Sequence, residues 1–356
     1  ASEGMDYGSL PKGLLKFHKY EDKVRTPVEE HFSEGASYAV SAGNIVHLHF
    51  TVSPEHQAKF EQHVDEIKSY YEKLTGVTYD ITFSQQKKST DTIAVDMDNK
   101  PFVDGGEILF RPAGHGALLA NLDDLDGDVV FIKNIDNVVP DELKESTIQY
   151  KQVIGGLMIE LQDKIFELTE KLIGGAVSDH IEEAEEFLHS KINLNLPEEY
   201  NAFSANEKVQ FLLTKLDRPV RICGMVKNTG EPGGGPFWVF DDDGTEAIQI
   251  GETAQIDLSN SAQAEMLKNS THFSPTDLVC GIKDRNGQKY DLMKHRDPKT
   301  GFITSKSKSG RDLKAQELPG LWNGSMANWN SVMVEVPLST FNPVKSVNDL
   351  LKPAHQ

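Results

Sequence analysis

Residues 129–132 constrain the fold more than any other segment, because they form a continuous apolar run of Val, Val, Phe and Ile. A half-buried strand alternates apolar and polar side chains, whereas an unbroken short run is typical of a parallel strand buried on both faces. A sheet made of such strands needs helices against each face. The segment therefore predicts an α/β protein.

The preceding part of the chain shows the strand–helix alternation that such a protein requires. Residues 45–52 alternate strictly, with an apolar face and a polar face that carries His47 and His49. Pro54 and Glu55 then favour a helix start, and residues 77–83 read as a second strand. We predict a mostly parallel, doubly wound mixed sheet.

A helical region interrupts this pattern from about residue 142 to residue 216. Apolar residues recur there at spacings of three and four, which predicts one buried stripe on a long helix: Ile154, Leu157, Leu161, Ile165, Leu168 and Leu172. We divide the chain into residues 1–140, the first part of an α/β core; residues 141–217, a helical insertion; and residues 218–356, the remainder of the core with an irregular C-terminal region.

Charge and composition exclude several classes of partner. The 356 residues carry a formal net charge of -19, which opposes non-specific binding to nucleic acid and to anionic membranes. No window approaches the ~18 apolar residues of a membrane helix, and residues 1–7 do not resemble a signal peptide. The two cysteines, Cys223 and Cys280, lie in apolar stretches and form no disulfide framework, which favours a cytoplasmic protein.

The strongest candidate for chemistry is Asp136, which follows the apolar run in the sequence Asn134, Ile135, Asp136, Asn137. Ligands of doubly wound sheets bind beyond the carboxyl ends of the strands, and Mg²⁺ takes one or two carboxylates together with substrate phosphates. The alternative is structural, because asparagines form turns at strand ends and an aspartate can cap the next element.

A second candidate is the segment Arg111 to Ala117, in which Gly114 and Gly116 flank His115. Glycines let a ligand approach the backbone closely, and the N-terminus of a following helix offers free amides to an anion. The alternative is a plain turn between a strand and a helix.

Weaker candidates lie elsewhere. Lys12 stands in a loop and can neutralise phosphate charge, although most surface lysines have no such role. Gln85 follows the strand of residues 77–83. The glycine-rich residues 230–236 lack the lysine–serine ending of a phosphate-binding loop and are more simply a hairpin or a lid. His47 and His49 share a strand face, but the sequence supplies no third metal ligand.

Taken in order, these motifs resemble the UDP-sugar pyrophosphorylase branch of the sugar nucleotidyltransferases over roughly residues 10–140. Over its whole length the chain resembles a bacterial family of unknown function allied to those enzymes. The residues that carry the likeness are Lys12, Thr26, Pro27, residues 51–56, Gln85, Gly114, His115, Gly116, residues 134–137, residues 218–224 and residues 321–324.

The resemblance implies a nucleotide-diphospho-sugar-transferase-like fold, with Lys12 near the triphosphate, Gly114 and His115 near the base or sugar, and Asp136 on Mg²⁺. We expect Asp277 to supply a second metal ligand from just before a strand of residues 278–282. The pyrophosphorylases also have a glycine-rich loop ending in Arg before the Lys12 segment. The residues before Lys12 do not match it, so we expect either a piece of a longer protein or an altered mode of nucleotide binding.

Three functions follow as expectations. The first is an Mg²⁺-dependent nucleotidyltransferase acting on a nucleoside triphosphate and a sugar phosphate or similar monoester, with Lys12 and Asp136 as catalytic residues. Its substrate would be contacted by Gln85, Arg111, Gly114, His115, Gly116, Asn134 and Asn137. The second is a binding protein for a sugar nucleotide or phosphorylated metabolite. The third is a glycosyltransferase, which the isolated Asp136, without an Asp-x-Asp pair, does not favour.

Overall fold

The computed structural model describes residues 8–175, 177–230 and 233–356. Residues 1–7, which we do not expect to be a signal peptide, lie outside it. Contacts divide the chain into two compact units: unit 1 comprises residues 1–85, 133–153 and 336–356, and unit 2 comprises residues 86–132 and 154–335. The boundaries of these two units differ from those of the three segments predicted from the sequence. The segment boundaries stay a prediction.

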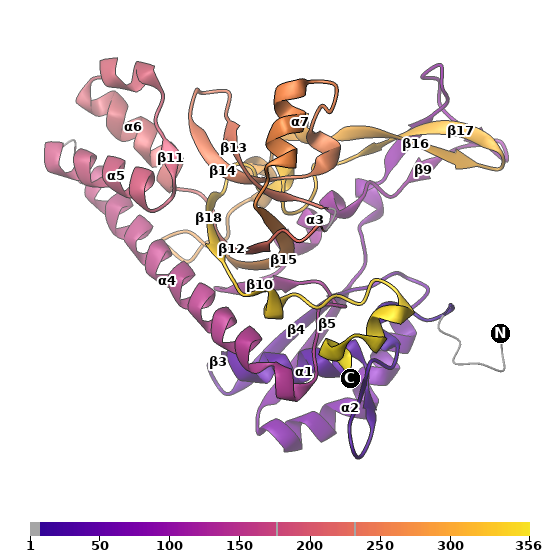
Figure 1. Ribbon diagram of the computed structural model, residues 1–356. Coiled ribbons are helices and arrows are strands. Elements are labelled where there is room, and N and C mark those ends of the chain that lie inside the picture. Colours follow the sequence, from indigo (N-terminus) through magenta and orange to yellow (C-terminus); the bar gives the residue numbers. More distant parts are fainter. Residues whose placement is uncertain (1–7, 176, 231–232) are drawn as a thin grey trace. The chain divides into compact units, whose positions relative to one another are not determined.

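Unit 1 is a small α/β unit in which helices α1 and α2 lie beside strands β4 and β5 (Figure 1). Its elements are β1 (His18–Lys19), β2 (Val24–Arg25), α1 (Pro27–Tyr38), β3 (Val40–Ser41), β4 (Ile45–Thr51), α2 (Gln57–Thr75), β5 (Thr78–Ser84) and the beginning of α4 (Glu145–Ile173).

Local sequence explains these elements well. Helix α1 begins where Thr26 caps it, because the Thr26 side chain accepts a hydrogen bond from the Glu29 N–H while Glu29 returns one to the Thr26 N–H. Helix α2 ends at Gly76, whose φ of 75° is the left-handed conformation that glycine adopts most easily. Strands β4 and β5 pair in parallel, as predicted, and the apolar face of β4 packs on both helices.

A buried network of charged side chains joins several segments of unit 1. Glu30 in α1 is fully buried and accepts a hydrogen bond from His18 at 3.0 Å. Arg25 lies 3.5 Å from the same carboxylate, and Lys144 forms an ion pair with it. The second ring nitrogen of His18 lies 2.9 Å from His355, near the C-terminus. The network therefore ties the last residues to α1.

This network makes the stability of the protein depend on pH. Burial, followed by the nearby His18, lowers the pKa of His355 from 6.5 to about 4. The unfolded chain then binds more protons than the folded chain between these two values. The contribution of neutral His355 to the free energy of unfolding is therefore fully present above about pH 6.5 and is lost as the pH falls toward 4.

Urea unfolding at several pH values between 7 and 4 measures this effect. We expect the pH dependence in this window to shrink in His355→Gln and to persist in a control, His47→Gln, whose side chain is 59% exposed. Equal pH dependence in the two variants and the parent chain would contradict the assignment to His355.

Unit 2 contains two larger sheets and most of the helical region. Its elements are β6 (Thr92–Val95), β7 (Val103–Asp104), β8 (Glu107–Ile108), β9 (Phe110–Arg111), α3 (Leu119–Asp123), β10 (Val130–Lys133, whose last residue falls in unit 1), the remainder of α4, α5 (Ser178–Ser190), β11 (Leu194–Asn195), α6 (Ala205–Leu216), β12 (Val220–Lys227), β13 (Gly235–Phe240), β14 (Glu246–Gly251), α7 (Ser261–Lys268), β15 (His272–Gly281), β16 (Phe302–Lys308), β17 (Arg311–Glu317) and β18 (Asn330–Glu335).

The central sheet of unit 2 has the order β10-β15-β12-β18 and is mixed, because β12 pairs in parallel with β18 and antiparallel with β15. The mixed α/β class is thus confirmed. One detail of the prediction is wrong: every residue of β10 is only half-buried. Among the described residues β10 ends the sheet, and an apolar run alone does not distinguish a central strand from an edge strand.

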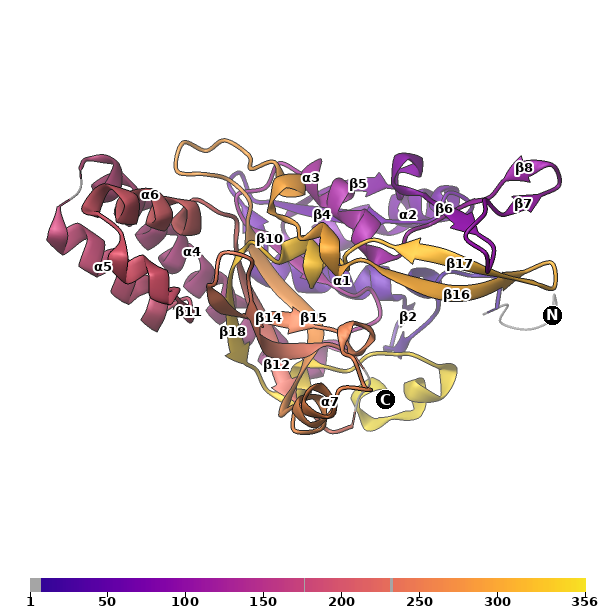
Figure 2. The same cartoon turned by 90° about the horizontal axis from the view of Figure 1, so that it is seen from above.

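The helical region forms as predicted, with α4, α5 and α6 in succession (Figure 2). Five of the six predicted stripe residues of α4 are buried, and Leu157 is half-buried. Near the C-terminus, Val347–Leu351 form a 3₁₀ helix. Cys223 and Cys280 are both buried, and each is a thiol.

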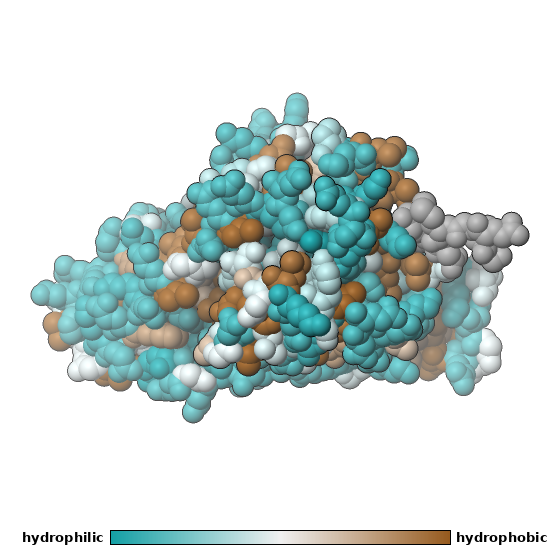
Figure 3. Space-filling model, turned by 90° about the horizontal axis from the view of Figure 1, so that it is seen from below, coloured by the Kyte–Doolittle hydropathy of each residue, from teal (hydrophilic) through white to brown (hydrophobic). Residues whose placement is uncertain are grey.

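The surface agrees with the composition. Hydrophilic residues cover most of the face seen in Figure 3, and hydrophobic residues are scattered among them. Within the part of the chain that the structure describes, no helix combines the length and the apolar character needed to cross a membrane.

Candidate functional site

The structure brings together the two residues predicted to be catalytic. The Nζ atom of Lys12 lies 2.5 Å from Oδ2 of Asp136, although 124 residues separate them in the chain. The Lys12 side chain is 41% exposed and that of Asp136 is 12% exposed. An ammonium and a carboxylate thus meet at a surface that a solute can reach, within unit 1.

Close packing fixes the position of Lys12. It begins a short 3₁₀ helix, Lys12–Leu14, in which the next residue is Gly13. A Cβ atom on Gly13 would lie 2.8 Å from the Phe60 ring and 3.3 Å from Ile135. Glycine at this position therefore lets the Lys12 segment approach both α2 and the turn that carries Asp136.

The turn after β10 fixes the position of Asp136. The Asn137 N–H donates to the Asn134 carbonyl at 3.1 Å, which closes the turn. The Asp136 carbonyl accepts a hydrogen bond from the Val344 N–H, also at 3.1 Å. Asp136 is therefore held by its backbone, and its side chain is left to face Lys12.

Two residues of helix α1 contact the turn that carries Asp136 and the residue just before it. The Nε2–H group of His31 donates to the Ile135 carbonyl at 3.1 Å. Just before the turn, Lys133 forms a 2.7 Å ion pair with Glu34, which is fully buried. Burial lowers the pKa of His31 to about 4, so its ring is neutral at pH 7. Sequence reasoning missed these residues, because nothing local links α1 to a turn about 100 residues later.

The other predicted residues of unit 1 have different surroundings. Asn137 is buried, and its side chain donates to the Thr340 carbonyl and accepts from the Asn342 N–H. Asn134 is exposed. Gln85 is also exposed, and its Nε2 donates to the Gln57 side chain at 2.7 Å. Substrate contacts by these three residues stay predictions.

A second cluster of side chains lies in unit 2, around His115. Its ring stacks on Trp322 with a centroid separation of 4.2 Å and an interplanar angle of 19°. Its Nδ1 accepts the Leu321 N–H at 2.9 Å, and its Nε2 lies 3.2 Å from Glu252. The predicted turn and short helix are present, because a 3₁₀ helix, His115–Leu118, leads into α3.

The glycines beside His115 serve contacts within the protein. A Cβ atom on Gly116 would lie 2.0 Å from the Pro319 carbonyl oxygen. Gly114 adopts a φ of 77°, and a Cβ there would lie 2.9 Å from the Glu317 carboxylate. The sequence predicted that a ligand could approach the backbone at Gly116. In the structure, the main chain at Pro319 occupies that space.

The segment carrying Trp322 adds a buried polar group to this cluster. Asn323 is 2% exposed and donates to Gln255 at 2.9 Å, while its Oδ1 has no hydrogen-bond partner among the described residues. Residues 321–324 carry part of the family resemblance in the sequence. Nothing in the sequence connects Trp322, Asn323 or Glu252 with His115, since that proximity arises only on folding.

The last two predicted residues also lie in unit 2. Arg111 is half-buried in β9, opposite Thr92. Asp277 is buried inside β15, opposite Gly224, so the expected strand begins at His272 and not after Asp277. Within the described residues no three His, Cys, Asp or Glu side chains converge as a metal site. A metal role for Asp277 stays a prediction.

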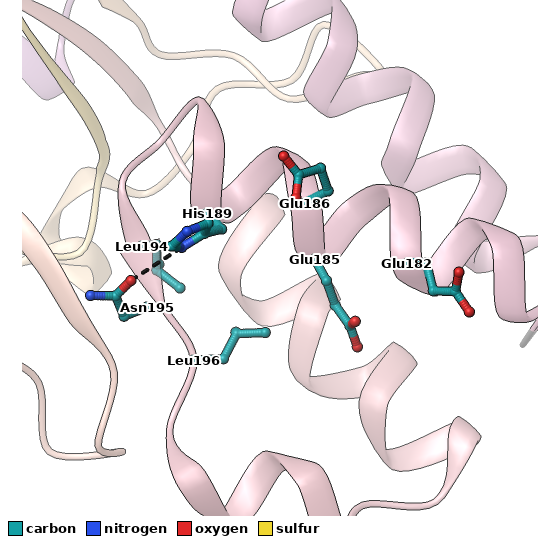
Figure 4. Close-up of a pocket in the computed structure, with 7 residues that line it drawn as sticks. All are labelled: Glu182, Glu185, Glu186, His189, Leu194, Asn195 and Leu196. Atoms are coloured by element: carbon teal, nitrogen blue, oxygen red, sulfur yellow. Dashed lines mark hydrogen bonds between the residues drawn. The ribbon is translucent and has the colours of Figure 1, made fainter.

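Of the hollows among the described residues, two lie in unit 2, away from the predicted residues. One, of ≈ 420 Å³, lies against α5, where Glu182, Glu185 and Glu186 line it together with His189 and Asn195 (Figure 4). The other, of ≈ 260 Å³, lies beside the described part of the glycine-rich loop. That loop connects β12 to β13, which belong to different sheets, so it does not close a hairpin.

Comparisons with known proteins define the family and the fold. The family described as "Domain of unknown function (DUF4301)" matches residues 1–356. A search of the curated proteins found no match. Two crystal structures of UDP-glucose pyrophosphorylase mutants from Leishmania major, both in complex with UDP-glucose, are similar to this chain with TM-scores of 0.51 and 12% sequence identity.

The similarity covers 96% of this chain but only 61% and 60% of those two chains, so this chain spans about three fifths of their length. At this identity the similarity shows the fold alone. It confirms the predicted nucleotidyltransferase-like fold.

Proposed function

We propose that this chain, which belongs to the family described as a domain of unknown function (DUF4301), acts as an Mg²⁺-dependent nucleotidyltransferase. Its substrates would be a nucleoside triphosphate and a sugar phosphate or similar phosphate monoester. An oxygen of the acceptor phosphate attacks the α-phosphorus of the triphosphate, the bond from that phosphorus to the bridging oxygen breaks, and pyrophosphate leaves.

The observation that carries this proposal is the 2.5 Å pair of Lys12 and Asp136. Transfer of a phosphoryl or nucleotidyl group depends on positioning and on neutralising negative charge, and it needs no protein nucleophile. The ammonium group of Lys12 can move from Asp136 to a phosphate oxygen and neutralise its negative charge. Asp136 supplies a carboxylate that a cation can share once Lys12 has moved.

The donor set suits Mg²⁺. This cation keeps several waters and usually takes one or two carboxylates together with substrate phosphates, so a site with few protein ligands is sufficient. Asp136 would hold the ion, and a metal role for Asp277 stays a prediction from the sequence. When bound, Mg²⁺ would neutralise the phosphates; Lys12, Asp136 and the turn held by His31 would orient them.

The proposed substrate class draws on the comparison, since the two similar structures contain UDP-glucose. The His115 ring, stacked on Trp322, is a flat surface of the kind that contacts a base or a sugar face. We therefore include His115 among the proposed substrate contacts, with Gly114 and Gly116 shaping its loop. The net charge of -19 makes nucleic acid a poor substrate by comparison.

Turnover by the unaltered chain tests this function. Each common nucleoside triphosphate is incubated with glucose 1-phosphate, with and without Mg²⁺, and pyrophosphate release is measured. In parallel, UDP-glucose is tested in a thermal shift, where a ligand at ~100 times its dissociation constant adds roughly 2.7 kcal/mol. We expect Mg²⁺-dependent release. Stabilisation without release would indicate a binding protein, and the absence of both would overturn the proposal.

A further inference from the structure

A hydrogen bond to the His115 ring determines which of its nitrogens carries the proton. A backbone N–H only donates, so Nδ1, which receives the Leu321 N–H at 2.9 Å, must be the unprotonated nitrogen of a neutral ring. The proton then lies on Nε2. That atom faces the Oε1 atom of Glu252 at 3.2 Å, and a carboxylate only accepts.

Glu252 is itself held in place. It follows strand β14 and caps a short 3₁₀ helix, Thr253–Gln255, in which its side chain accepts the Gln255 N–H. Its own N–H donates to Oε1 of Gln255 at 2.9 Å, and the same oxygen accepts from Asn323. Both the carboxylate beside His115 and the loop that carries Trp322 therefore depend on Gln255.

The ring of His115 has little freedom between these groups. Trp322 lies against one face, and a Cβ atom on Gly320 would come within 2.6 Å of Cε1 of His115. The imidazole is thus confined on one face, along one edge and at both nitrogens. The His115 side chain is still 31% exposed, so a ligand can reach it.

From this geometry we propose that Glu252 is the positioning residue of His115. It keeps the imidazole in the Nε2–H form and flat against Trp322. His115 can then contact a ligand in two ways, by donating a hydrogen bond from Nε2 or by stacking through the face of its ring. The ligand atom that bonds to His115 is then a hydrogen-bond acceptor, such as a phosphate or carbonyl oxygen. This statement about the ligand rests on the proposed function; the positioning of the ring does not.

Nitrogen-15 NMR of the ring nitrogens tests the positioning directly. The chain contains 12 histidines, so the His115 signals are assigned by their loss in His115→Gln. We expect a protonated Nε2 and an unprotonated Nδ1, with ring protons shifted upfield by the Trp322 indole. In Glu252→Ala the two tautomers should exchange and the upfield shift should decrease. Glu252→Gln, which keeps an oxygen acceptor, should restore both signatures.

A matched control is available in the same unit. His272 forms a similar 2.9 Å pair with Glu335. Glu335→Gln should leave the His115 signals unchanged, which separates loss of one partner from a general change in the fold. Unaltered tautomer and ring-proton signals in Glu252→Ala would overturn the proposal, because Leu321 and Trp322 would then suffice to hold the ring.

Titration with UDP-glucose by calorimetry tests the consequence for binding. We expect about tenfold weaker binding in Glu252→Ala, because the His115 ring is no longer held in the orientation that meets the ligand, and near-parental binding in Glu252→Gln. If the parent chain does not bind UDP-glucose, the proposed function fails at this point. The positioning role of Glu252 is still decided by the NMR signals, so the two failures are distinguishable.

Discussion

Asp136→Asn is expected to reduce pyrophosphate release at least about 100-fold, the usual size of the loss when one preorganised charge at a reacting phosphate or carbonyl is removed. Asparagine has nearly the same shape as aspartate, but it lacks the charge that holds Lys12 at 2.5 Å and that would bind Mg²⁺. The rate of pyrophosphate release at saturating substrate and several Mg²⁺ concentrations measures the effect. Added Mg²⁺ should not restore the rate.

The same substitution should hardly change stability, which separates a functional effect from unfolding. Lys12 is 41% exposed, and pairs that are open to solvent contribute at most about 1 kcal/mol. Asp80→Asn is the matched control, since Asp80 forms an exposed pair with His47 in the same unit. Equal turnover by the parent chain, Asp136→Asn and Asp80→Asn would show that Asp136 has no role in the reaction.

Glu30→Ala is expected to lower the free energy of unfolding by about 3–5 kcal/mol, because removing one partner of a buried ion pair leaves the other charges buried and unpaired. Glu30 is fully buried beside His18, Arg25 and Lys144. Burial alone raises the pKa of its carboxyl, but the hydrogen bond from His18 and the charge of Lys144 hold that pKa below its ordinary value.

Urea denaturation at pH 7 measures this loss. The control is Glu61→Ala on α2, where the carboxylate is exposed and accepts a hydrogen bond from Gln57 in its own helix. That variant should stay within about 0.5 kcal/mol of the parent. A loss of less than about 1 kcal/mol in Glu30→Ala would contradict the network, since it would mean that water reaches these side chains.

Several predictions succeeded because the signals behind them are local. The alternation of residues 45–52 has the period of a strand whatever surrounds it, and β4 is present as Ile45–Thr51. Pro54 and Glu55 favour a helix start through effects that act within the first turn, and α2 begins close by, at Gln57. The order of the Lys12, Gly114 and Asp136 segments indicated the fold before the structure placed any of them.

Other features depend on which strands become neighbours, and that is decided by pairing between distant segments. The apolar run before Asp136 suited a central strand equally well, yet β10 pairs only with β15 among the described strands. Asp277 was expected before a strand and lies inside β15, because pairing with β12 extends that strand back to His272. Hydrogen-bond partners of a strand cannot be read from the strand alone.

The sequence by itself determined several elements of this protein, among them β4, β5 and the helical region. It also determined the α/β class and singled out Lys12 and Asp136 as candidates for one site. Only the tertiary structure decided how the turn of Asp136 is held, through the hydrogen bond of His31 to Ile135 and the ion pair of Lys133 with Glu34. The tertiary structure also decided that Glu252 and Trp322 lie against His115. The reason is physical: periodicity and capping act over a few residues, whereas these contacts join segments that are about 100 or more residues apart and become neighbours only when the chain has folded.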